Sequence, residues 1–207
     1  MFITFEGIDY SGKSTQAKLL YEYLKSKKIK VVLLREPGGT KISEKIREII
    51  LNRDHLEMTP VTEFLLFSSA RVQLVNEIIL PYLKKNYVVI CDRYYDSSSA
   101  YQGYGGKLDI NSINRINDFV TGGLKPDITF LIDLAPKPAF ERQQAIKKSK
   151  DRMENKNLSF FNRVYKGYKT IAAGNKKRFV VIDGKKSIEE IHKIVIKKSI
   201  KYLKGFN

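Results

Sequence analysis

The sequence predicts an α/β fold of three layers, in which a parallel five-stranded sheet is flanked by helices on both sides. Short apolar runs alternate along the chain with longer stretches of helical period, the pattern of repeated strand–helix units. These runs are nearly continuous in apolar residues, which is typical of strands buried on both faces. The composition, 43% hydrophobic and 29% charged, is that of a globular protein. With 207 residues and no Pro/Gly/Ser-rich linker, we expect residues 1–207 to form a single domain.

The expected elements follow in order along the chain. The strands are Phe2–Phe5, Lys30–Leu34, Tyr87–Cys91, Ile128–Leu134 and Phe179–Ile182. The helices are Gln16–Ser26, Ile42–Leu51, Thr62–Lys84, Leu158–Ala173 and Ser187–Leu203. Ligands bind at the carboxyl ends of the strands in such sheets, so the residues just after each apolar run are the candidates for a site.

Charge and cysteine content narrow the function classes. The net charge of +16 indicates a polyanionic partner, such as a nucleic acid, a membrane surface or a phosphorylated substrate. A single cysteine excludes an internal disulfide framework and fits a reducing compartment, so we expect a cytoplasmic location. The opening residues do not resemble a signal peptide. We see no apolar run that approaches the ~18 residues of a membrane span, and expect no membrane association.

The first apolar run is followed by a phosphate-binding loop. Gly7, Ile8, Asp9, Tyr10, Ser11, Gly12, Lys13 and Ser14 match G-x-x-x-x-G-K-[ST] in full, and Thr15 comes next. Glycines let backbone N–H groups approach phosphate oxygens, and the following helix presents its positive N-terminal end. Lys13 brings a positive charge to the terminal phosphates, and the Ser14 hydroxyl can bind Mg²⁺. The strand before and the helix after the loop favour a fold of the P-loop NTPase type.

Three classes of phosphate-loop protein then compete. A GTPase needs Asn-Lys-x-Asp after a late strand, and the sequence Asn-Lys-Lys-Arg at 175–178 lacks the aspartate. A nucleic-acid ATPase commonly ends its second-motif strand with Asp-Glu, whose glutamate polarises water. Here that strand ends in Asp92 and Arg93. Asp92 can serve Mg²⁺, but a guanidinium instead suits charge stabilisation during transfer between phosphates, which favours a kinase.

Several segments, in order over most of the chain, resemble the thymidylate kinase family. They are Phe-Glu-Gly-Ile-Asp at 5–9, Leu-Arg-Glu-Pro-Gly-Gly-Thr at 34–40, Phe-Ser-Ser-Ala-Arg at 67–71, Asp-Arg-Tyr at 92–94, Asp-Ser-Ser-Ser-Ala-Tyr-Gln-Gly at 96–103 and, more weakly, Asp-Arg-Met-Glu at 151–154. The resemblance implies that the chain phosphorylates dTMP to dTDP with Mg-ATP, in dTTP synthesis. It also implies a homodimer, for which the helix at 62–84 is a plausible interface.

The resemblance further implies an acceptor site. Phe67 would stack on thymine while Arg71, four residues further along one helix face, hydrogen-bonds the edge of the base. Judged without the resemblance, Phe67 would be a core residue. The ring of Tyr101 would crowd a 2′-hydroxyl and so select deoxyribose. The residues implied in dTMP binding are Asp9, Arg35, Glu36, Pro37, Arg47, Phe67, Arg71, Arg93, Ser98, Tyr101 and Gln102.

On the donor side, residues at about 143–156 resemble the lid that closes on ATP and excludes water; the other interpretation of their lysine run is a solvated basic loop. Arg142 and Asp183 match positions near the adenine, although Arg142 is nearly as readily an ordinary surface arginine. The implied metal ligands are Ser14, Asp92 and Asp9, and the implied catalytic residues are Lys13, Arg93, Arg152 and Asp9. Tyr10 stands where the family usually carries Gly or Arg, so we expect the lid to supply charge, chiefly through Arg152.

Two rival functions stay open. One is a kinase for another nucleotide or deoxynucleoside on the same fold. The other is a basic nucleic-acid-binding ATPase, against which Asp92 followed by Arg93 and the lack of a recognition motif argue. We therefore expect small-molecule substrates, dTMP and ATP, and no nucleic-acid partner, with most of the lysine excess solvated or snorkelling.

Overall fold

A computed structural model describes residues 1–146 and 151–203 of the chain. Its centre is a five-stranded sheet in the order β2-β3-β1-β4-β5, with every neighbouring pair parallel. The strands are β1 (Phe2–Glu6), β2 (Val31–Arg35), β3 (Val88–Asp92), β4 (Ile128–Asp133) and β5 (Phe179–Asp183). The predicted fold class and all five predicted strands are confirmed. The prediction that every strand is buried on both faces is wrong for β2 and β5, because these two form the edges of the sheet and are partly exposed.

The five predicted helices are also present. In full, the helices are α1 (Lys13–Ser26), α2 (Lys41–Leu51), α3 (Pro60–Leu74), the π-helical turn η1 (Val75–Ile79), α4 (Leu80–Lys84), α5 (Tyr95–Ser98), the π-helical turn η2 (Ser99–Gly105), α6 (Ile110–Thr121), α7 (Pro136–Ile146), α8 (Leu158–Gly174) and α9 (Ile188–Leu203). The sequence analysis missed α5, η2, α6 and α7. The single helix expected at 62–84 is α3, η1 and α4 in continuous succession.

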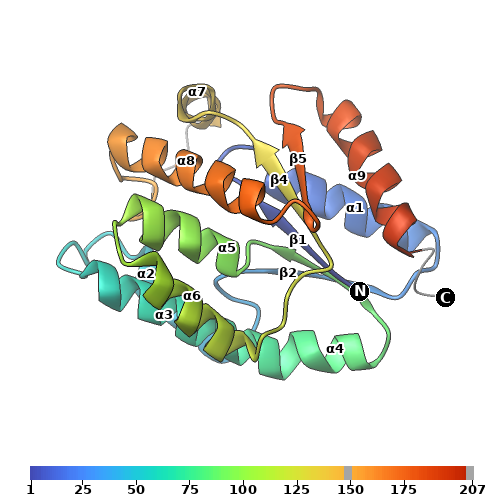
Figure 1. The fold of residues 1–207 in the computed structure, drawn as a ribbon, viewed down its shortest axis with the longest axis horizontal. Helices are drawn as coiled ribbons and strands as arrows, with labels where there is room; N and C mark the ends of the chain where they lie inside the picture. Colours follow the sequence, from blue (N-terminus) through green and yellow to red (C-terminus); the bar gives the residue numbers. More distant parts are fainter. Residues whose placement is uncertain (147–150, 204–207) are drawn as a thin grey trace.

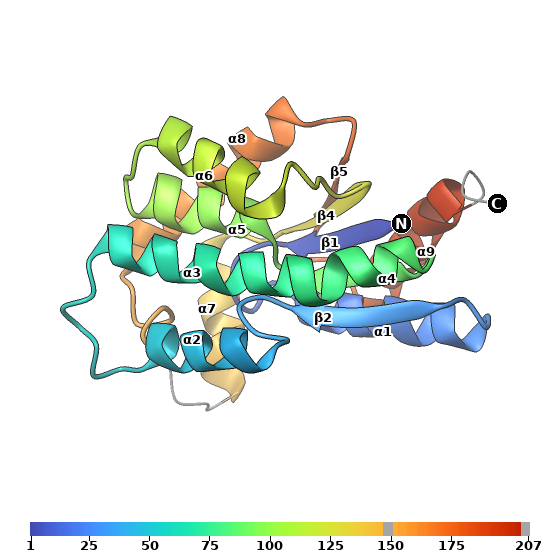
Figure 2. The ribbon, with the colours of Figure 1, turned by 90° about the horizontal axis from the view of Figure 1, so that it is seen from below.

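The helices cover the two faces of the sheet in separate layers. On one face, α1 and α9 pack their apolar sides on alternate residues of the strands, including Ile3, Phe5 and Phe130. On the other face, α3, η1 and α4 cover β3 while α8 covers β4 and β5. Figure 1 shows α1 and α9 together on one side of the sheet, and Figure 2 shows α3 and α4 running along the opposite side. Apolar side chains thus fill both interfaces, as the continuous apolar strands require.

One helical segment corrects the expectation that no apolar run approaches membrane-spanning length. The stretch Pro60–Lys84, comprising α3, η1 and α4, has 25 residues and reaches a mean hydropathy of 1.2 in an 18-residue window. This is weak support for a membrane span, since a core helix of a soluble protein passes the same test. The stretch also contains Arg71, whose side chain is buried in an ion pair with Glu36.

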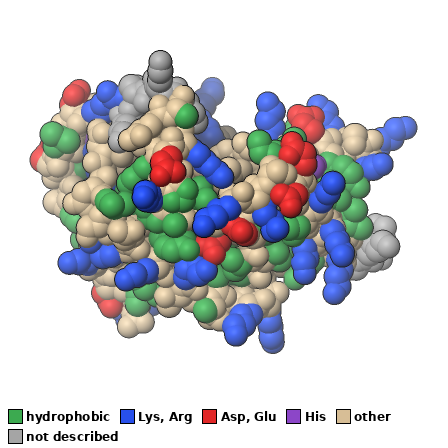
Figure 3. Space-filling view, turned by 90° about the horizontal axis from the view of Figure 1, so that it is seen from above, with side chains coloured by type: hydrophobic (Ala, Val, Ile, Leu, Met, Phe, Trp, Pro, Cys, Tyr) green, Lys and Arg blue, Asp and Glu red, His purple; other side chains and the backbone are tan. Residues whose placement is uncertain are grey.

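The positive charge is dispersed over the surface. In α9, for example, Ile191 and Val195 are buried while Lys193, Lys197 and Lys201 are exposed. Figure 3 shows Lys and Arg side chains scattered over one whole face, with Asp and Glu side chains between them. The lysines of α9 therefore lie on the solvated side of an amphipathic helix.

Candidate active site

The phosphate-binding loop links β1 to α1, and two glycines shape it. Gly7 has φ 141°, and a Cβ there would lie 2.8 Å from the carbonyl oxygen of Ile132. Gly12 has φ 101° and caps α1, which begins at Lys13. Both backbones therefore require glycine, and the loop directs the first turn of α1 toward its own concave side. The first turn places the Lys13 side chain in a buried position and leaves Ser14 and Thr15 exposed.

Arg93 is placed by the end of β3 in an unusual conformation. Its φ is 72°, a left-handed value that is rare for a residue with a side chain. Its backbone N–H donates to the carbonyl oxygen of Phe5 in the neighbouring strand. The guanidinium Nη2 lies 2.6 Å from Asp9 Oδ1. This ion pair joins the loop after β3 to the phosphate-binding loop after β1. The strained backbone thus serves to aim a guanidinium at the phosphate-binding loop.

Asp9 is held ionised by its surroundings. Burial opposes ionisation, but the charges of Arg93 and Lys13 and a hydrogen bond from Tyr101 outweigh it and hold the pKa of Asp9 well below its usual range. The Tyr101 hydroxyl donates to Asp9 Oδ2 at 2.7 Å and accepts from Arg93 Nη2 at 3.1 Å. Burial lowers the pKa of Lys13, and the carboxylates of Asp92 and Asp9 oppose that shift. The carboxylate of Asp9 therefore lies between two cations, Lys13 and Arg93, beside the phosphate-binding loop.

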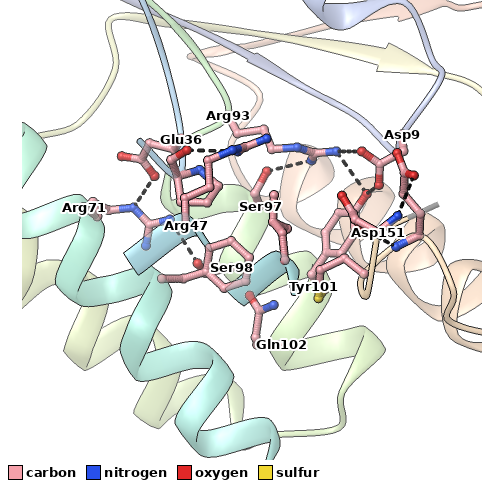
Figure 4. A pocket seen from close by; sticks show the side chains of 15 residues that line it. Asp9, Glu36, Arg47, Arg71, Arg93, Ser97, Ser98, Tyr101, Gln102 and Asp151 are labelled. Carbon is pink, nitrogen blue, oxygen red and sulfur yellow. Dashed lines mark hydrogen bonds and ion pairs between the residues drawn. The ribbon is translucent and has the colours of Figure 1, made fainter. Parts of the chain in front are cut away.

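A pocket of about 590 Å³, its open mouth included, joins this loop to α3 and η2. Among its lining residues are Asp9, Glu36, Pro37, Arg47, Phe67, Arg71, Arg93, Ser98, Tyr101 and Gln102. Figure 4 shows Arg71 and Glu36 at one end and Asp9 and Tyr101 at the other, with the Arg93 guanidinium pointing toward Asp9. The structure therefore brings together ten of the eleven residues expected to bind the acceptor. Pockets of this size take small organic ligands.

The far end of the pocket is built around a buried arginine. Arg71 is 1% exposed, and its Nε donates to Glu36 Oε2 at 2.7 Å. Its other nitrogens donate to Asn117 Oδ1, the carbonyl oxygen of Tyr94 and Ser98 Oγ. Arg71 thus has a fixed orientation, and the half-buried ring of Phe67, one helical turn away, lies beside it on the pocket wall.

Two carboxylates, those of Glu36 and Glu63, lie at this end of the pocket and have different partners. Burial raises the pKa of Glu36 to about 7, against the opposing charge of Arg71. Its Oε1 has no hydrogen-bond partner among the described residues. Glu63 accepts from Gln102 Nε2 at 2.9 Å, which turns the amide oxygen of Gln102 away from Glu63. An unpartnered carboxylate oxygen and an oriented amide are both able to receive hydrogen bonds from a ligand.

Arg142 bridges two loops on the donor side. Its Nη1 donates to the carbonyl oxygen of Ser11 at 3.2 Å, and its Nη2 to that of Gly184 at 2.8 Å. Asp183 is exposed at the end of β5, and its Oδ1 accepts from the backbone of Lys185. Arg142 therefore lies between the phosphate loop and the loop after β5, where an adenine would be expected.

Two expected residues lie elsewhere. Arg35 is exposed and donates to both carboxylate oxygens of Glu44, at 3.1 and 3.0 Å, outside the pocket lining. Arg152 is 5% exposed and forms an ion pair of 2.7 Å with Glu63, while its Nε donates to the carbonyl oxygen of Ile50. These partners turn Arg152 toward α2 and α3 instead of the phosphate loop, because a buried guanidinium requires a counter-charge. Residues 147–150 of the expected lid lie outside the described residues.

Sequence reasoning missed several residues of this region. Glu6 ends β1 and contacts Ser97 and Tyr168, which in turn contact Arg93. A signal existed for Glu6, since it is a carboxylate at the end of an apolar run beside the phosphate loop. Ser97 adjoins the expected Ser98, but nothing in the sequence marks Tyr168, 71 residues further on. Tyr10 also has an unforeseen contact, because its hydroxyl donates to Glu154 Oε1 at 2.9 Å.

The described residues contain no group of three or more His, Cys, Asp or Glu side chains that could hold a metal on its own. Asp92 Oδ1, at the end of β3, is nevertheless one of several buried side-chain oxygens that lack a hydrogen-bond partner in the described part of the chain. Asp92 is the last residue of β3, and its charge acts on Lys13.

Comparisons with known proteins agree with this geometry. A model of the family described as thymidylate kinase matches residues 5–195. A thymidylate kinase of Caldanaerobacter subterraneus is 47% identical over 204 residues, covering 99% of this chain and 97% of that protein. The chain belongs to the thymidylate kinase family. A thymidylate kinase of Exiguobacterium is 45% identical over 203 residues, or 98% of this chain and 95% of that protein.

A solved structure extends the agreement to three dimensions. The crystal structure of a thymidylate kinase from Ehrlichia chaffeensis is 39% identical, with a TM-score of 0.78 over 95% of this chain and 96% of that one. The predicted family, fold and enzyme class are confirmed. As a member of this family, the chain is a phosphotransferase whose small-molecule substrates are dTMP and ATP.

Proposed function

We propose that this chain transfers the γ-phosphoryl group of Mg-ATP to dTMP within the pocket between the phosphate loop and α3. The observation that carries the proposal is the continuity of that pocket. It joins a ring and a buried guanidinium suited to a pyrimidine to a second guanidinium that contacts the phosphate loop.

At the far end, Phe67 offers its ring for stacking and Arg71 offers a donor fork fixed by Glu36. Ser98 accepts from Arg71, so the serine supports the guanidinium that meets the base. The amide oxygen of Gln102, oriented by Glu63, is an acceptor for a ring N–H. These residues would hold a neutral pyrimidine edge without bringing another charge into a buried site.

The middle of the pocket would hold the sugar against Tyr101. The ring of Tyr101 is packed edge-on against Phe160, Phe161 and Tyr168, with centroids 6.1–6.3 Å away. Its hydroxyl is also fixed by Asp9 and Arg93. A ring held on all these sides cannot yield to an extra hydroxyl, which supports selection of deoxyribose by exclusion.

The near end would hold the reacting phosphates. We infer that Arg93 and Arg47 bind the acceptor phosphate, whereas Arg35 serves the α2 side through Glu44. A phosphate oxygen of dTMP attacks the γ-phosphorus in line, and the bond from that phosphorus to the β–γ bridging oxygen breaks to release ADP. Lys13 and Arg93 stabilise the negative charge during transfer, and no protein base is needed for an anionic nucleophile.

The donor is held by residues 7–15, with Arg142 and Asp183 on the adenine side. Asp92, with its unpartnered Oδ1, and the exposed Ser14 fit Mg²⁺, since both supply the oxygen ligands that it prefers, and Asp9 is a third oxygen donor. Bound there, Mg²⁺ supplies neutralisation of phosphate charge. We retain a lid at about 143–156 as part of the single domain 1–207, but assign Arg152 a structural task in it.

We also propose a homodimer. Three of the exposed large apolar side chains lie on α3 and α6, with Val61 and Leu65 about half exposed and Phe119 85% exposed. Figure 2 shows that α3 and α6 lie on the same side of the sheet. Exposed apolar surface of this kind marks interfaces. Sedimentation would show a dimer for the protein and monomers for Phe119→Asp, while a dimer unaffected by that change would place the interface elsewhere.

We infer that the protein has no nucleic-acid or membrane partner. We also infer that it is located in the cytoplasm. The dispersed lysines support the first inference, because nucleic-acid binding needs basic side chains gathered along a path. The free, buried Cys91 is compatible with a reducing compartment. Tight binding of duplex or single-stranded DNA at physiological salt would contradict the first inference.

The test of the proposed function is a coupled assay of ATP-to-ADP conversion with dTMP, dUMP, UMP and thymidine as acceptors. We expect dTMP to be the best acceptor, UMP to be strongly disfavoured, and turnover to require Mg²⁺. Faster turnover of thymidine than of dTMP would indicate the rival deoxynucleoside kinase. ATP hydrolysis that DNA stimulates would indicate the rival ATPase.

A further inference from the structure

Glu6 occupies a costly position that the proposed function does not use. It is the last residue of β1, is 0% exposed, and does not line the pocket. Burial and the charge of Asp96 raise the pKa of Glu6 to about 7, while the Ser97 hydroxyl, Arg93 and the Tyr94 N–H oppose that shift. Ionising a carboxylate here thus works against folding, and an apolar side chain would suit burial better.

The surroundings of Glu6 consist of hydrogen-bond donors. Oε1 accepts from the backbone N–H of Tyr94 at 2.8 Å. Oε2 accepts from the Ser97 hydroxyl at 2.6 Å and from the Tyr168 hydroxyl at 3.0 Å. An ionised carboxylate only accepts, so it satisfies all three donors at once. The arrangement is therefore matched to the ionised form.

The two hydroxyls transmit this arrangement to Arg93. Their protons point at Glu6, so their oxygen lone pairs are free to accept from Arg93 Nη1, at 3.1 Å for Ser97 and 3.2 Å for Tyr168. The two hydroxyl oxygens are also only 2.9 Å apart. Without the carboxylate, one hydroxyl would donate to the other, and the remaining hydroxyl proton would have no fixed acceptor. The two oxygens would then no longer be held as acceptors for Arg93 Nη1.

Glu6 also holds Arg93 through the backbone. The Tyr94 N–H that it accepts belongs to the residue directly after Arg93, whose φ of 72° is strained. The Arg93 N–H, on the other side, donates to Phe5 next to Glu6. The end of β1 therefore accepts hydrogen bonds from the backbone N–H groups of Arg93 and Tyr94. Through Ser97 and Tyr168 it also fixes the acceptors around the Arg93 guanidinium.

We propose that Glu6 is a positioning residue for phosphoryl transfer, which fixes the Arg93 guanidinium through Ser97, Tyr168 and the Tyr94 N–H. The proposal rests on the role of Arg93 in the proposed function. The charged groups that interact with Glu6 include Arg93 after β3, Asp96 in α5, Lys13 at the start of α1 and Arg178 before β5. Asp96 is itself neutralised by Arg178, which contacts its two oxygens at 2.7 and 2.8 Å.

The test uses Glu6→Gln, which keeps the shape of the side chain. Its amide N–H groups must face either the Tyr94 N–H, which is repulsive, or the two hydroxyls, whose protons must then turn away from residue 6 and whose oxygens then accept from the amide as well as from Arg93. We expect kcat to fall on the order of 10- to 100-fold, the usual loss for an outer supporting residue, while the KM for ATP stays within about twofold. Glu6→Asp should recover part of kcat, because it restores the acceptor-only charge.

Thr4→Val is the matched control. Thr4 is two residues away on β1, is equally buried, and contacts only the Thr129 hydroxyl, at 2.8 Å, among the polar side chains of the described chain. It removes a buried polar group from the same strand and should leave kcat unchanged. A kcat loss in Thr4→Val equal to that in Glu6→Gln would assign the effect to general disturbance of β1 and overturn the proposal.

A double-mutant cycle with Arg93→Lys separates this proposal from the proposed function. If Glu6 acts through Arg93, the Glu6→Gln loss should shrink to less than threefold once Arg93 is replaced. A full loss in both backgrounds would overturn the positioning role and leave the proposed function intact. An unchanged kcat in Arg93→Lys itself would instead refute the role of Arg93, and the role of Glu6 with it.

Discussion

The two ends of the pocket solve the same problem in different ways. Each pairs an arginine with a buried glutamate whose pKa burial raises to about 7. At the base end, Glu36 contacts Arg71 directly, and one carboxylate oxygen has no partner among the described residues. At the phosphate end, Glu6 reaches Arg93 indirectly, through the Ser97 and Tyr168 hydroxyls and the Tyr94 N–H, and both of its oxygens have partners.

The difference follows from what each arginine must meet. Arg71 would bind a neutral base, so a directly paired, fully buried guanidinium suffices. Arg93 would meet phosphate charge that changes during the reaction, and its side chain is more exposed than that of Arg71. Arg93 already pairs directly with Asp9 at 2.6 Å, so a second direct carboxylate would add further negative charge where phosphate must bind, whereas the indirect contact of Glu6 orients the guanidinium without occupying it. The molecule thus separates binding at one end from charge stabilisation at the other.

The largest effects are expected when each of the two arginines is replaced by lysine, which tests whether the two ends of the pocket differ in function. Lysine keeps the positive charge, so the neighbouring carboxylates are not left unpaired. It lacks the planar donor fork of arginine, so the change removes only the directed hydrogen bonds. Arg93→Lys should lower kcat about 10²- to 10³-fold with little change in the KM for ATP. Arg71→Lys should instead raise the KM for dTMP about tenfold or more. Steady-state kinetics with each substrate varied would check both, and a loss of kcat alone in Arg71→Lys would contradict the division of labour.

A third buried pair, Glu63 with Arg152, sharpens the comparison because neither side chain lines the pocket, although Glu63 orients Gln102, which does. From the sequence, Arg152→Ala should lower kcat sharply while dTMP binding changes little. From the structure, the same change removes the closest cation of a buried carboxylate, leaving it Gln102 and the more distant Lys156, and should lower the free energy of unfolding by about 3 kcal/mol. Thermal unfolding measured beside kcat decides between them. A normal melting temperature with a low kcat would restore Arg152 as the lid cation.

The sequence allowed the strands and the phosphate loop to be predicted because their signals are local. Apolar runs mark β1 to β5, and the glycine spacing of the loop is required by its own φ values. The stretch at 95–105 was missed because its Ser, Gly and Tyr residues have weak helical pattern. Packing provides the missing support, since Gly105 lies so close to α8 that a Cβ there would be 2.6 Å from Val164 Cγ2.

The candidate site divides in the same way. Lys13, Arg71 and Arg93 belong to short motifs, so their presence in one pocket was predictable. The destination of Arg152 was not, because its partner Glu63 lies 89 positions earlier and a lysine-rich neighbourhood suggests solvent. Tyr168 contacts Glu6 across 162 positions, and no spacing rule connects them. Long-range pairing of buried charges is decided by packing rather than by local pattern.

The smallest expected effect concerns the pH dependence of stability at the base end. Burial raises the pKa of Glu36 from its ordinary 4.5 to about 7 in the folded protein. The folded state therefore binds this proton more tightly than the unfolded state does. Its contribution to stability is complete below pH 4.5 and is lost as the pH rises through about 7. Glu36→Gln cannot titrate, so the wild type should lose roughly 2 to 3 kcal/mol of unfolding free energy relative to this variant between pH 4.5 and 8.

Denaturant unfolding of both proteins across that pH range measures this difference, and Glu44→Gln is the control. Glu44 is exposed, and hydrogen bonds from Gly39 and Arg35 overcome its slight burial and lower its pKa, so its stabilising contribution has the opposite sign and is present at high pH. Added dTMP should reduce the Glu36 difference if a ligand donor fills the unpartnered Oε1, because a hydrogen bond to the ionised form lowers its pKa. An identical pH dependence for wild type and Glu36→Gln would mean that Arg71 keeps Glu36 ionised throughout. In that case the base end would resemble the phosphate end, and the contrast between the two would lie in the hydroxyls around Glu6 alone.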